Sequence, residues 1–352
     1  MTLSPAPPAR YLLRPCNADD LPALERFAAA SPVGITTLPF DRAFLSDRLQ
    51  RSMHAFATED ASGEEIYLFA LEDLDAGGVI GISGIAARAG FNDRFYSYRN
   101  EFVVHSSRVL GVSTRIHTLH LCHDLTDVTL FISFHIDPAY VHTLAPQLLS
   151  RARLLFIAQH AERFAERVAA ESAGMADDAG RCPFWDAVGR RFFGMDYPTI
   201  ERLTGGRSKA FIADLMPLSP IYVPLLPEEA QFAIGQLHPI AELPFSILLD
   251  EGFDADSYLD IFDGGPTVQE RLAMLKTVNR ARVLTAHAGA SADGGWQMVC
   301  TTAREQFRAV LVQASPDARS ITLDPRTLSA LGVGPGAPLR VAALDTPQEP
   351  HP

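Results

Sequence analysis

The stretch RIHTLHLCHDLTDVTLFISFHI, residues 115–136, decides how this chain folds, because it holds two strand-like runs in succession. Residues 115–123 and 128–136 each carry the apolar and β-branched side chains that are typical of strands. A short polar turn separates them, so we predict a β-hairpin. A long amphipathic helix is predicted over residues 143–169, with a strand near residues 167–173.

The segments on either side of this stretch also alternate between strands and helices. Residues 66–72 and 79–86 predict a hairpin across a glycine-containing loop, and residues 11–14 predict a short strand. A short helix is predicted at residues 183–193 and another strand near residues 209–215. The order of these elements predicts a mixed α/β (α+β) fold.

Composition excludes several classes of protein. The chain has 352 residues, of which 47% are hydrophobic and 20% are charged, and this is an ordinary globular composition. A formal net charge of -12 argues against a partner that is nucleic acid or an anionic membrane. No apolar run approaches the ~20 residues that a membrane helix needs. Four widely spaced cysteines and the lack of a targeting pattern at the N-terminus predict a cytoplasmic protein.

Two segments in the late middle of the chain bear side chains suited to chemistry. His238, in the run GQLHP at residues 235–239, titrates in the range needed for proton transfer, but it is equally suited to capping the turn before Pro239. Asp260 and Asp263 precede two glycines. Their carboxylates could pair with a guanidinium or ammonium group, or the segment could simply form a tight turn.

The order and spacing of these and other motifs over roughly residues 10–345 resemble the arginine N-succinyltransferase family, and most closely its alpha-type subunit. The further matching segments are SPVGITTLP (31–39), FYSYRN (95–100), HSSR (105–108), HDLT (123–126), PFW (183–185), KAFIADLMP (209–217) and PIY (220–222). The resemblance implies an acetyltransferase-like (GNAT) acyl-CoA N-acyltransferase fold with a small β-rich C-terminal module. It also implies transfer of a succinyl group from succinyl-CoA to the α-amino group of L-arginine or L-ornithine in arginine catabolism.

The resemblance also suggests how the chain is divided. We expect a disordered lead-in, an acetyltransferase-like core, a family-specific extension that carries His238 and the glycine pair, a β-rich module and a tail. The corresponding ranges are 1–9, 10–216, 217–270, 271–345 and 346–352.

The loop that would cradle the cofactor departs from the usual pattern. Acyl-CoA transferases of this fold place glycines between a core strand and the next helix, where backbone N–H groups bind the pyrophosphate. The matching stretch here, DPAYVHTLAP at residues 137–146, has no glycine, and Pro146 lacks an N–H. We therefore predict a weakened CoA site in this chain. This favours a hetero-oligomer with a related beta-type subunit over a self-sufficient homo-oligomer.

The resemblance assigns roles to several residues. It makes His238 the proton donor, and it places the acyl or pantetheine arm along the backbone of Phe134, which could otherwise be a core aromatic residue. Other candidates for contacts to substrate or CoA are Thr37, Tyr98, Arg99 and Arg108, although surface ion pairs are an alternative for both arginines.

We expect no resident metal or redox cofactor, and succinyl-CoA acts as a co-substrate. Three histidines and a cysteine lie within residues 117–123, but alternation along a strand places His120 and Cys122 on the opposite face from His117 and His123. Two hypotheses follow for the whole chain. It is either the succinyl-transferring subunit of an arginine N-succinyltransferase, or a non-catalytic structural or regulatory subunit that partners a catalytic beta-type paralogue.

Overall fold

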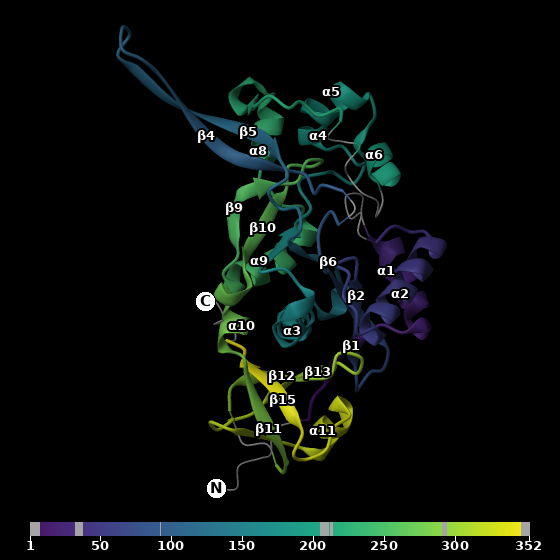
Figure 1. Ribbon diagram of the computed structural model, residues 1–352. Coiled ribbons are helices and arrows are strands. Elements are labelled where there is room, and N and C mark those ends of the chain that lie inside the picture. The colour runs from purple at the N-terminus through teal and green to yellow at the C-terminus, as the bar shows by residue number, and fades with distance from the viewer. Residues whose placement is uncertain are drawn as a thin grey trace.

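A computed structural model shows a mixed α/β fold, with helices on both faces of a long twisted sheet (Figure 1). It describes residues 8–31, 38–91, 93–204, 211, 214–290 and 294–345. All the strands named below join through hydrogen bonds into one continuous sheet, in the order β14-β11-β15-β12-β13-β1-β2-β3-β6-β7-β10-β9-β4-β5-β8.

The centre of the sheet contains five adjacent strands. These are β1 (Tyr11–Pro15), β2 (Ile66–Asp73), β3 (Val79–Ala86), β6 (Thr129–Ile136) and β7 (Arg167–Glu171). The predicted strand at residues 11–14 and the predicted hairpin of β2 with β3 are confirmed. Within this group β6 and β7 run parallel and the other neighbours run antiparallel.

The predicted hairpin between residues 115–123 and 128–136 is wrong, although both strands exist. β5 (Val112–Cys122) pairs with β4 (Ser97–Ser107) and β8 (Ile221–Tyr222), whereas β6 pairs with β3 and β7. The connection between β5 and β6 is held against an earlier segment, since Asp127 N–H donates to the Ala89 carbonyl at 2.8 Å. Strand patterns show that a strand forms, but they do not choose its neighbour.

Helices cover the two faces of the central strands. α3 (Ala145–Gln159) packs on the face that carries Tyr67, Phe69 and Ile85. α1 (Leu21–Ala30) and α2 (Arg42–Ala57) pack on the other face (Figure 1). α3 is shorter than the predicted helix over residues 143–169, because the chain leaves the helix at His160 and enters β7 at Arg167.

The predicted helix over residues 183–193 forms as two short helices, α4 (Pro183–Ala187) and α5 (Gly189–Phe193). The next helices are α6 (Tyr197–Thr204) and α8 (Glu228–Ala233). Most of the predicted strand near residues 209–215 lies outside the described residues.

The last third of the chain adds strands to both ends of the central group. β10 pairs with β7, β9 pairs with β4, and β13 pairs with β1. The elements are α9 (Glu242–Glu251), β9 (Asp254–Leu259), β10 (Pro266–Arg271), α10 (Lys276–Arg280), β11 (Arg282–Ala288), β12 (Trp296–Thr301), β13 (Ala309–Gln313), β14 (Ser320–Leu323), α11 (Pro325–Leu331) and β15 (Pro338–Ala343). The β-rich C-terminal segment is therefore continuous with the central strands through hydrogen bonds.

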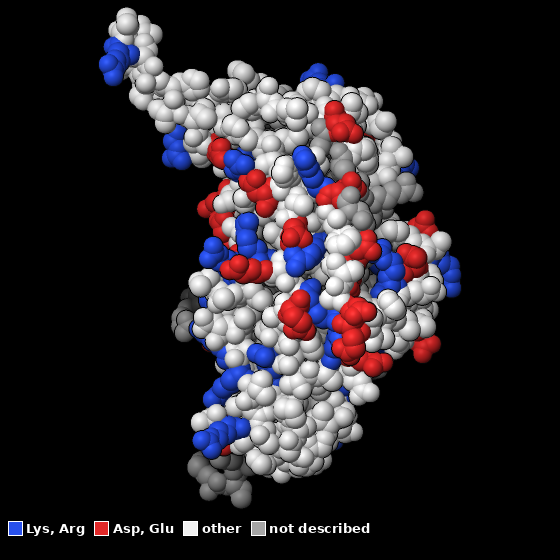
Figure 2. All heavy atoms as spheres, viewed as in Figure 1, with Lys and Arg blue, Asp and Glu red and all other residues white. Residues whose placement is uncertain are grey.

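The outer part of the β4–β5 hairpin projects from the body (Figure 1). β9 reaches β4 only at Tyr98 and Arg99, and β8 reaches β5 only at Thr118 and Leu119. Figure 2 shows acidic and basic side chains interspersed over the body, and a projecting hairpin that is mostly uncharged. Within the described part of the chain, no helix is both long and apolar enough to cross a membrane.

Candidate active site

A pocket opens where β6 and β7 separate. The two strands pair only at residues 129–131 and 168–170, and β6 then continues without β7 beside it. The pocket is lined by residues 130–134 of β6 and residues 170–173 at the end of β7, and parts of 240–248 and 260–263 close it. Strands that diverge in this way leave backbone and side chains of both facing one space, which suits a ligand that inserts between them.

A β-bulge bends β6 at the pocket. The register with β3 shifts between Ile82 and Gly84, and opposite this shift Ser133 adopts a left-handed conformation with φ of 54°. Bulges redirect side chains and interrupt strand pairing, and they are frequent beside active sites. The bulge puts Phe134 on the wall of this pocket and also on the wall of a second, adjoining pocket.

One end of the pocket carries a buried cation. Arg153 of α3 is only 2% exposed, and its guanidinium lies 4.0 Å from the centre of the Phe131 ring. Its hydrogen bonds go to uncharged acceptors: the Ser150 carbonyl at 3.0 Å, the Ser150 hydroxyl at 3.1 Å and the Gly84 carbonyl at 3.4 Å. Burial lowers the pKa of Arg153 to about 9, so the side chain stays charged at neutral pH.

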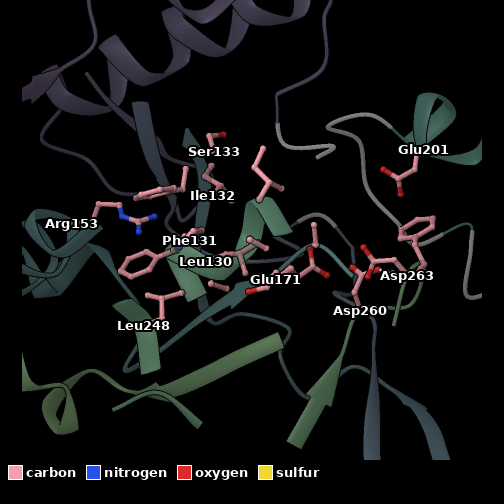
Figure 3. Close-up of a pocket in the computed structure, with 18 residues that line it drawn as sticks. Leu130, Phe131, Ile132, Ser133, Arg153, Glu171, Glu201, Leu248, Asp260 and Asp263 are labelled. Carbon is pink, nitrogen blue, oxygen red and sulfur yellow. Dashed lines mark hydrogen bonds between the residues drawn. The ribbon is translucent and has the colours of Figure 1, made fainter. Parts of the chain in front are cut away.

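The other end of the pocket is acidic. Figure 3 shows Asp260 and Asp263 at this end, away from Arg153. Asp263 accepts hydrogen bonds from Gly174 N–H at 2.7 Å, Gly265 N–H at 2.8 Å and the Tyr197 hydroxyl at 3.3 Å. Burial and then the charge of Asp263 raise the pKa of Tyr197.

These contacts show that the two aspartates shape the turn as well as line the pocket. Asp260 accepts a hydrogen bond from Phe262 N–H at 2.6 Å within the same turn. Glu171 and Glu201 also line the cavity. The predicted tight turn at residues 260–265 is therefore observed, and both carboxylates also line the pocket, while their pairing with a cationic substrate stays a prediction.

His238 lies immediately behind the pocket wall. Its backbone N–H donates to the carbonyl of the lining residue Ala173 at 2.9 Å. Its ring Nδ1 accepts from the backbone N–H of Ile240 at 3.3 Å. The capping role that the sequence left open is thus observed. Because Nδ1 accepts, a neutral His238 carries its proton on Nε2, where it can be donated.

The second pocket shares Phe134, Ile240 and Pro244 with the first, so the two adjoin. It extends along the glycine-free loop, where it is lined by Asp137, Pro138, Val141 and His142. At least four backbone donors of the loop are occupied internally. Tyr140 N–H donates to the Asp137 carbonyl at 2.9 Å, and Thr143 N–H donates to the Tyr140 carbonyl at 3.0 Å. Ala139 N–H donates to Asp137 Oδ1 at 3.0 Å, and Ala145 N–H donates to Thr143 Oγ1 at 3.1 Å.

Comparison with known proteins gives the family. A family model described as the arginine N-succinyltransferase beta subunit matches residues 11–277. A second model, described as the C-terminal domain of that beta subunit, matches residues 279–343. This chain belongs to the arginine N-succinyltransferase family.

Individual members of the arginine N-succinyltransferase family match nearly the whole chain. Arginine N-succinyltransferase subunit alpha of Pseudomonas aeruginosa is 45% identical over 336 residues, covering 95% of this chain and 99% of that protein. The arginine N-succinyltransferase of Citrobacter koseri is 37% identical over 95% of this chain and 97% of its own length. The solved structure of arginine/ornithine succinyltransferase subunit AI from P. aeruginosa matches with a TM-score of 0.86 and 43% identity, covering 95% of this chain and 99% of that one. The predicted resemblance, including its alpha-type character, is confirmed.

Several of the predicted contact residues do not reach the pocket. Tyr98 is fully buried in a separate core, where its hydroxyl contacts Met216 Sδ at 3.6 Å and burial raises its pKa. Arg99 pairs with Asp124 at 2.8 Å and Glu101 at 3.1 Å, and these contacts raise its pKa. The surface-pair interpretation of Arg99 is the one observed, and the structure gives neither residue a path to a substrate in this pocket.

The remaining two candidates lie elsewhere. Arg108 is exposed in the turn at the tip of the projecting β4–β5 hairpin. Thr37 lies outside the described residues. The possible metal site at residues 117–123 has other contacts, since His117 hydrogen-bonds Asn100. Among the residues that the structure describes, no three His, Cys, Asp or Glu side chains are grouped to hold a metal ion.

Sequence reasoning overlooked Arg153, the most unusual charged group in the pocket. One signal was present in the sequence: α3, with the sequence APQLLSRARLLFIAQ, contains arginines but no acidic residue to pair with them. An arginine in an apolar helix with no local carboxylate must find its partner elsewhere in the fold or in a ligand.

Proposed function

We propose that this chain is the succinyl-transferring subunit of an arginine N-succinyltransferase. It takes succinyl-CoA as donor and the α-amino group of L-arginine or L-ornithine as acceptor. The observation that carries the proposal is the pocket between β6 and β7, with a buried cation at one end, carboxylates at the other and His238 against its wall. The activities named for relatives that cover 95% of the chain support it.

The division of the chain remains part of the proposal. We assign residues 10–216 to an acetyltransferase-like (GNAT) core, and the parallel β6–α3–β7 unit with its diverging strands supports this. Residues 217–270 form the extension that closes the pocket, and residues 271–345 form the β-rich module. A cytoplasmic location is proposed too, and four buried free thiols agree with a reducing compartment.

The chemistry follows from the two substrates. An α-amino group is mostly protonated near neutral pH, so it must lose a proton before it attacks the thioester carbonyl. That proton would go to solvent. His238 would then donate its Nε2 proton to the departing CoA thiolate and recover one from the nitrogen as the amide forms, while backbone groups of β6 near Phe134 would stabilise the developing oxyanion. Holding both substrates in one pocket would supply a large part of the rate.

A second candidate is favoured by the loop at residues 137–146. Its internal hydrogen bonds use donors that a CoA pyrophosphate would need, which supports a non-catalytic structural or regulatory role or a site shared with a beta-type subunit. The projecting hairpin supports such a partner, because its apolar side chains lie in solvent. They include Phe102, Val104, Val109, Leu110 and Val112. A homo-oligomer is the alternative assembly.

The test is release of CoA thiol from succinyl-CoA on addition of L-arginine. We expect His238→Asn to lower kcat by about 10²–10⁴-fold, because asparagine keeps the acceptor for Ile240 N–H but cannot transfer a proton. His54→Asn, at an exposed position in α2, is the matched control and should retain activity. Full activity in His238→Asn would exclude His238 from the chemistry. Activity that appears only with a co-expressed paralogue would establish the shared site.

A further inference from the structure

Arg153 differs from two other deeply buried arginines of this fold, Arg151 and Arg163, because it lines the pocket between β6 and β7. Arg151, in the same helix, is 3% exposed and pairs with Glu251 at 2.9 Å and with Asp250. Arg163 is 3% exposed and, like Arg153, has no carboxylate partner in the described part of the chain, but it donates to the Tyr67 hydroxyl at 2.7 Å and to four backbone carbonyls, and it does not line the pocket. Arg153 has three contacts to neutral oxygens and no carboxylate partner in the described part of the chain.

A buried guanidinium without an anion is costly, because its charge has left water and nothing of opposite charge compensates. Many neutral acceptors can offset this cost, as they do around Arg163, and an anionic ligand can offset it where the guanidinium lines a pocket. Arg153 lines the pocket, so an anion that entered would meet its remaining N–H donors. The planar fork of a guanidinium fits a carboxylate well.

Arg153 faces the part of β6 that carries the bulge. The guanidinium lies 4.0 Å from the Phe131 ring centre and 5.9 Å from that of Phe134, so it faces the strand on both sides of the bulge. The two carbonyl carbons of succinyl are three bonds apart, or roughly 4 Å. A thioester beside the bulge would thus hold its distal carboxylate within reach of the guanidinium.

We propose that Arg153 binds the free carboxylate of the succinyl group and so selects a dicarboxylic acyl donor over monocarboxylic acyl-CoA thioesters. This inference rests on the proposed function. It gives the carboxylate contact to an arginine inside the pocket, whereas the sequence had offered Arg99 and Arg108 as candidates for contacts to substrate or CoA. The acidic end of the same pocket is then left for the cationic acceptor.

The experiment compares succinyl-CoA with butyryl-CoA, in which a methyl group replaces the carboxylate, as donors to L-arginine. The wild-type enzyme, with a co-expressed paralogue if one is needed for activity, should prefer succinyl-CoA. Arg153→Met should lower kcat/KM for succinyl-CoA by about 100-fold, because a charge-assisted contact is lost, while butyryl-CoA is used as well as before or better. Arg153→Lys keeps the charge but loses the planar fork, so its kcat/KM for succinyl-CoA should lie between those of wild type and Arg153→Met.

The outcomes separate this inference from the proposed function. Equal losses with both donors in Arg153→Met would show that Arg153 only supports the fold, and the donor-selection role would be wrong while the transferase activity stands. Unchanged preference for succinyl-CoA in a folded variant would also overturn it. If wild type transfers neither acyl group, alone or with the paralogue, the proposed function itself fails and this inference fails with it.

Discussion

The two sides of α3 each carry a buried arginine, but the surroundings of the two arginines are opposite in character. On the side that meets α9 and α10, Arg151 is enclosed by Glu251 and Asp250, and Glu251 also accepts from Thr277 N–H at 2.8 Å and its hydroxyl at 2.7 Å. On the side that faces the pocket, Arg153 is equally buried but contacts only neutral oxygens and an aromatic ring.

This difference teaches that burial alone does not tell what a charged side chain is for. Lys276 pairs with Asp250 at 3.0 Å, so the charges of this cluster cancel within the fold, and the cluster contributes to holding α3, α9 and α10 together. A buried cation that lines a pocket without a carboxylate partner can instead bind an anionic ligand. The comparison predicts that Arg151 controls stability and Arg153 controls the choice of donor.

The largest effect on stability should come from removing Arg151 from its ion pairs with Glu251 and Asp250. Arg151→Met removes the cation and leaves the carboxylate of Glu251, itself 2% exposed, without its main partner. We expect the free energy of unfolding to fall by about 3–5 kcal/mol, measured by urea denaturation. The ratio of activity with succinyl-CoA to that with butyryl-CoA should stay at the wild-type value.

A double variant checks the cause of that loss. In Arg151→Met with Glu251→Leu the orphaned carboxylate is gone, so the loss should be smaller than the sum of the two single losses by at least about 1 kcal/mol. Strictly additive losses would mean that the two side chains do not act as a pair. The ion pair between Arg151 and Glu251 would then not explain the stability of this part of the fold.

The sequence predicts the elements of this fold better than their neighbours. The strands at residues 11–14, 66–72 and 79–86 form as expected, since each is set by its own apolar pattern. The pairing of β5 with β4 instead of β6 depends on which edges are filled in the complete sheet. No local pattern contains that information.

The site shows the same limit. Phe134 and the aspartates at 260 and 263 come from motifs, and the structure places them on the wall of one pocket. His238 does not line that pocket, but its backbone N–H donates to the lining residue Ala173. Tyr98 belongs to a motif as well, but its ring packs in a separate hydrophobic core and its hydroxyl contacts Met216. Arg153 was missed because its significance lies in the absence of a neighbour, which appears only when α3 is placed against the sheet.

On its other face, toward α1, β6 carries a second incompletely partnered group, which lines the second pocket and should give stability a pH dependence. His135 of β6 is 8% exposed, its Nδ1 lies 3.3 Å from Ser31 Oγ, and its Nε2 has no hydrogen-bond partner among the described residues. Burial, and then the charge of Arg48, lower its pKa from 6.5 to about 4. The unfolded chain therefore binds more protons within this window, and stability falls as the pH drops from 6.5 toward 4.

The expected slope is about 1.4 kcal/mol per pH unit inside the window. His135→Gln should remove that share of the slope in denaturation curves recorded at successive pH values. The half-buried His160, whose pKa burial lowers to about 4, stays in both proteins, so it cancels in the comparison. Parallel pH profiles for wild type and His135→Gln would show that the folded state already accommodates a charged His135.

The smallest effect should be the stability of Arg153→Met, and it is the strictest test of the comparison. The variant loses the stacking on Phe131 and hydrogen bonds to Ser150, but it also loses the cost of a buried charge that nothing in the described fold neutralises. These effects oppose each other, so the free energy of unfolding should stay within about 1 kcal/mol of wild type. A loss as large as that of Arg151→Met would mean that the fold itself depends on this cation. A small change together with a switched donor preference would mean that its missing partner is the substrate.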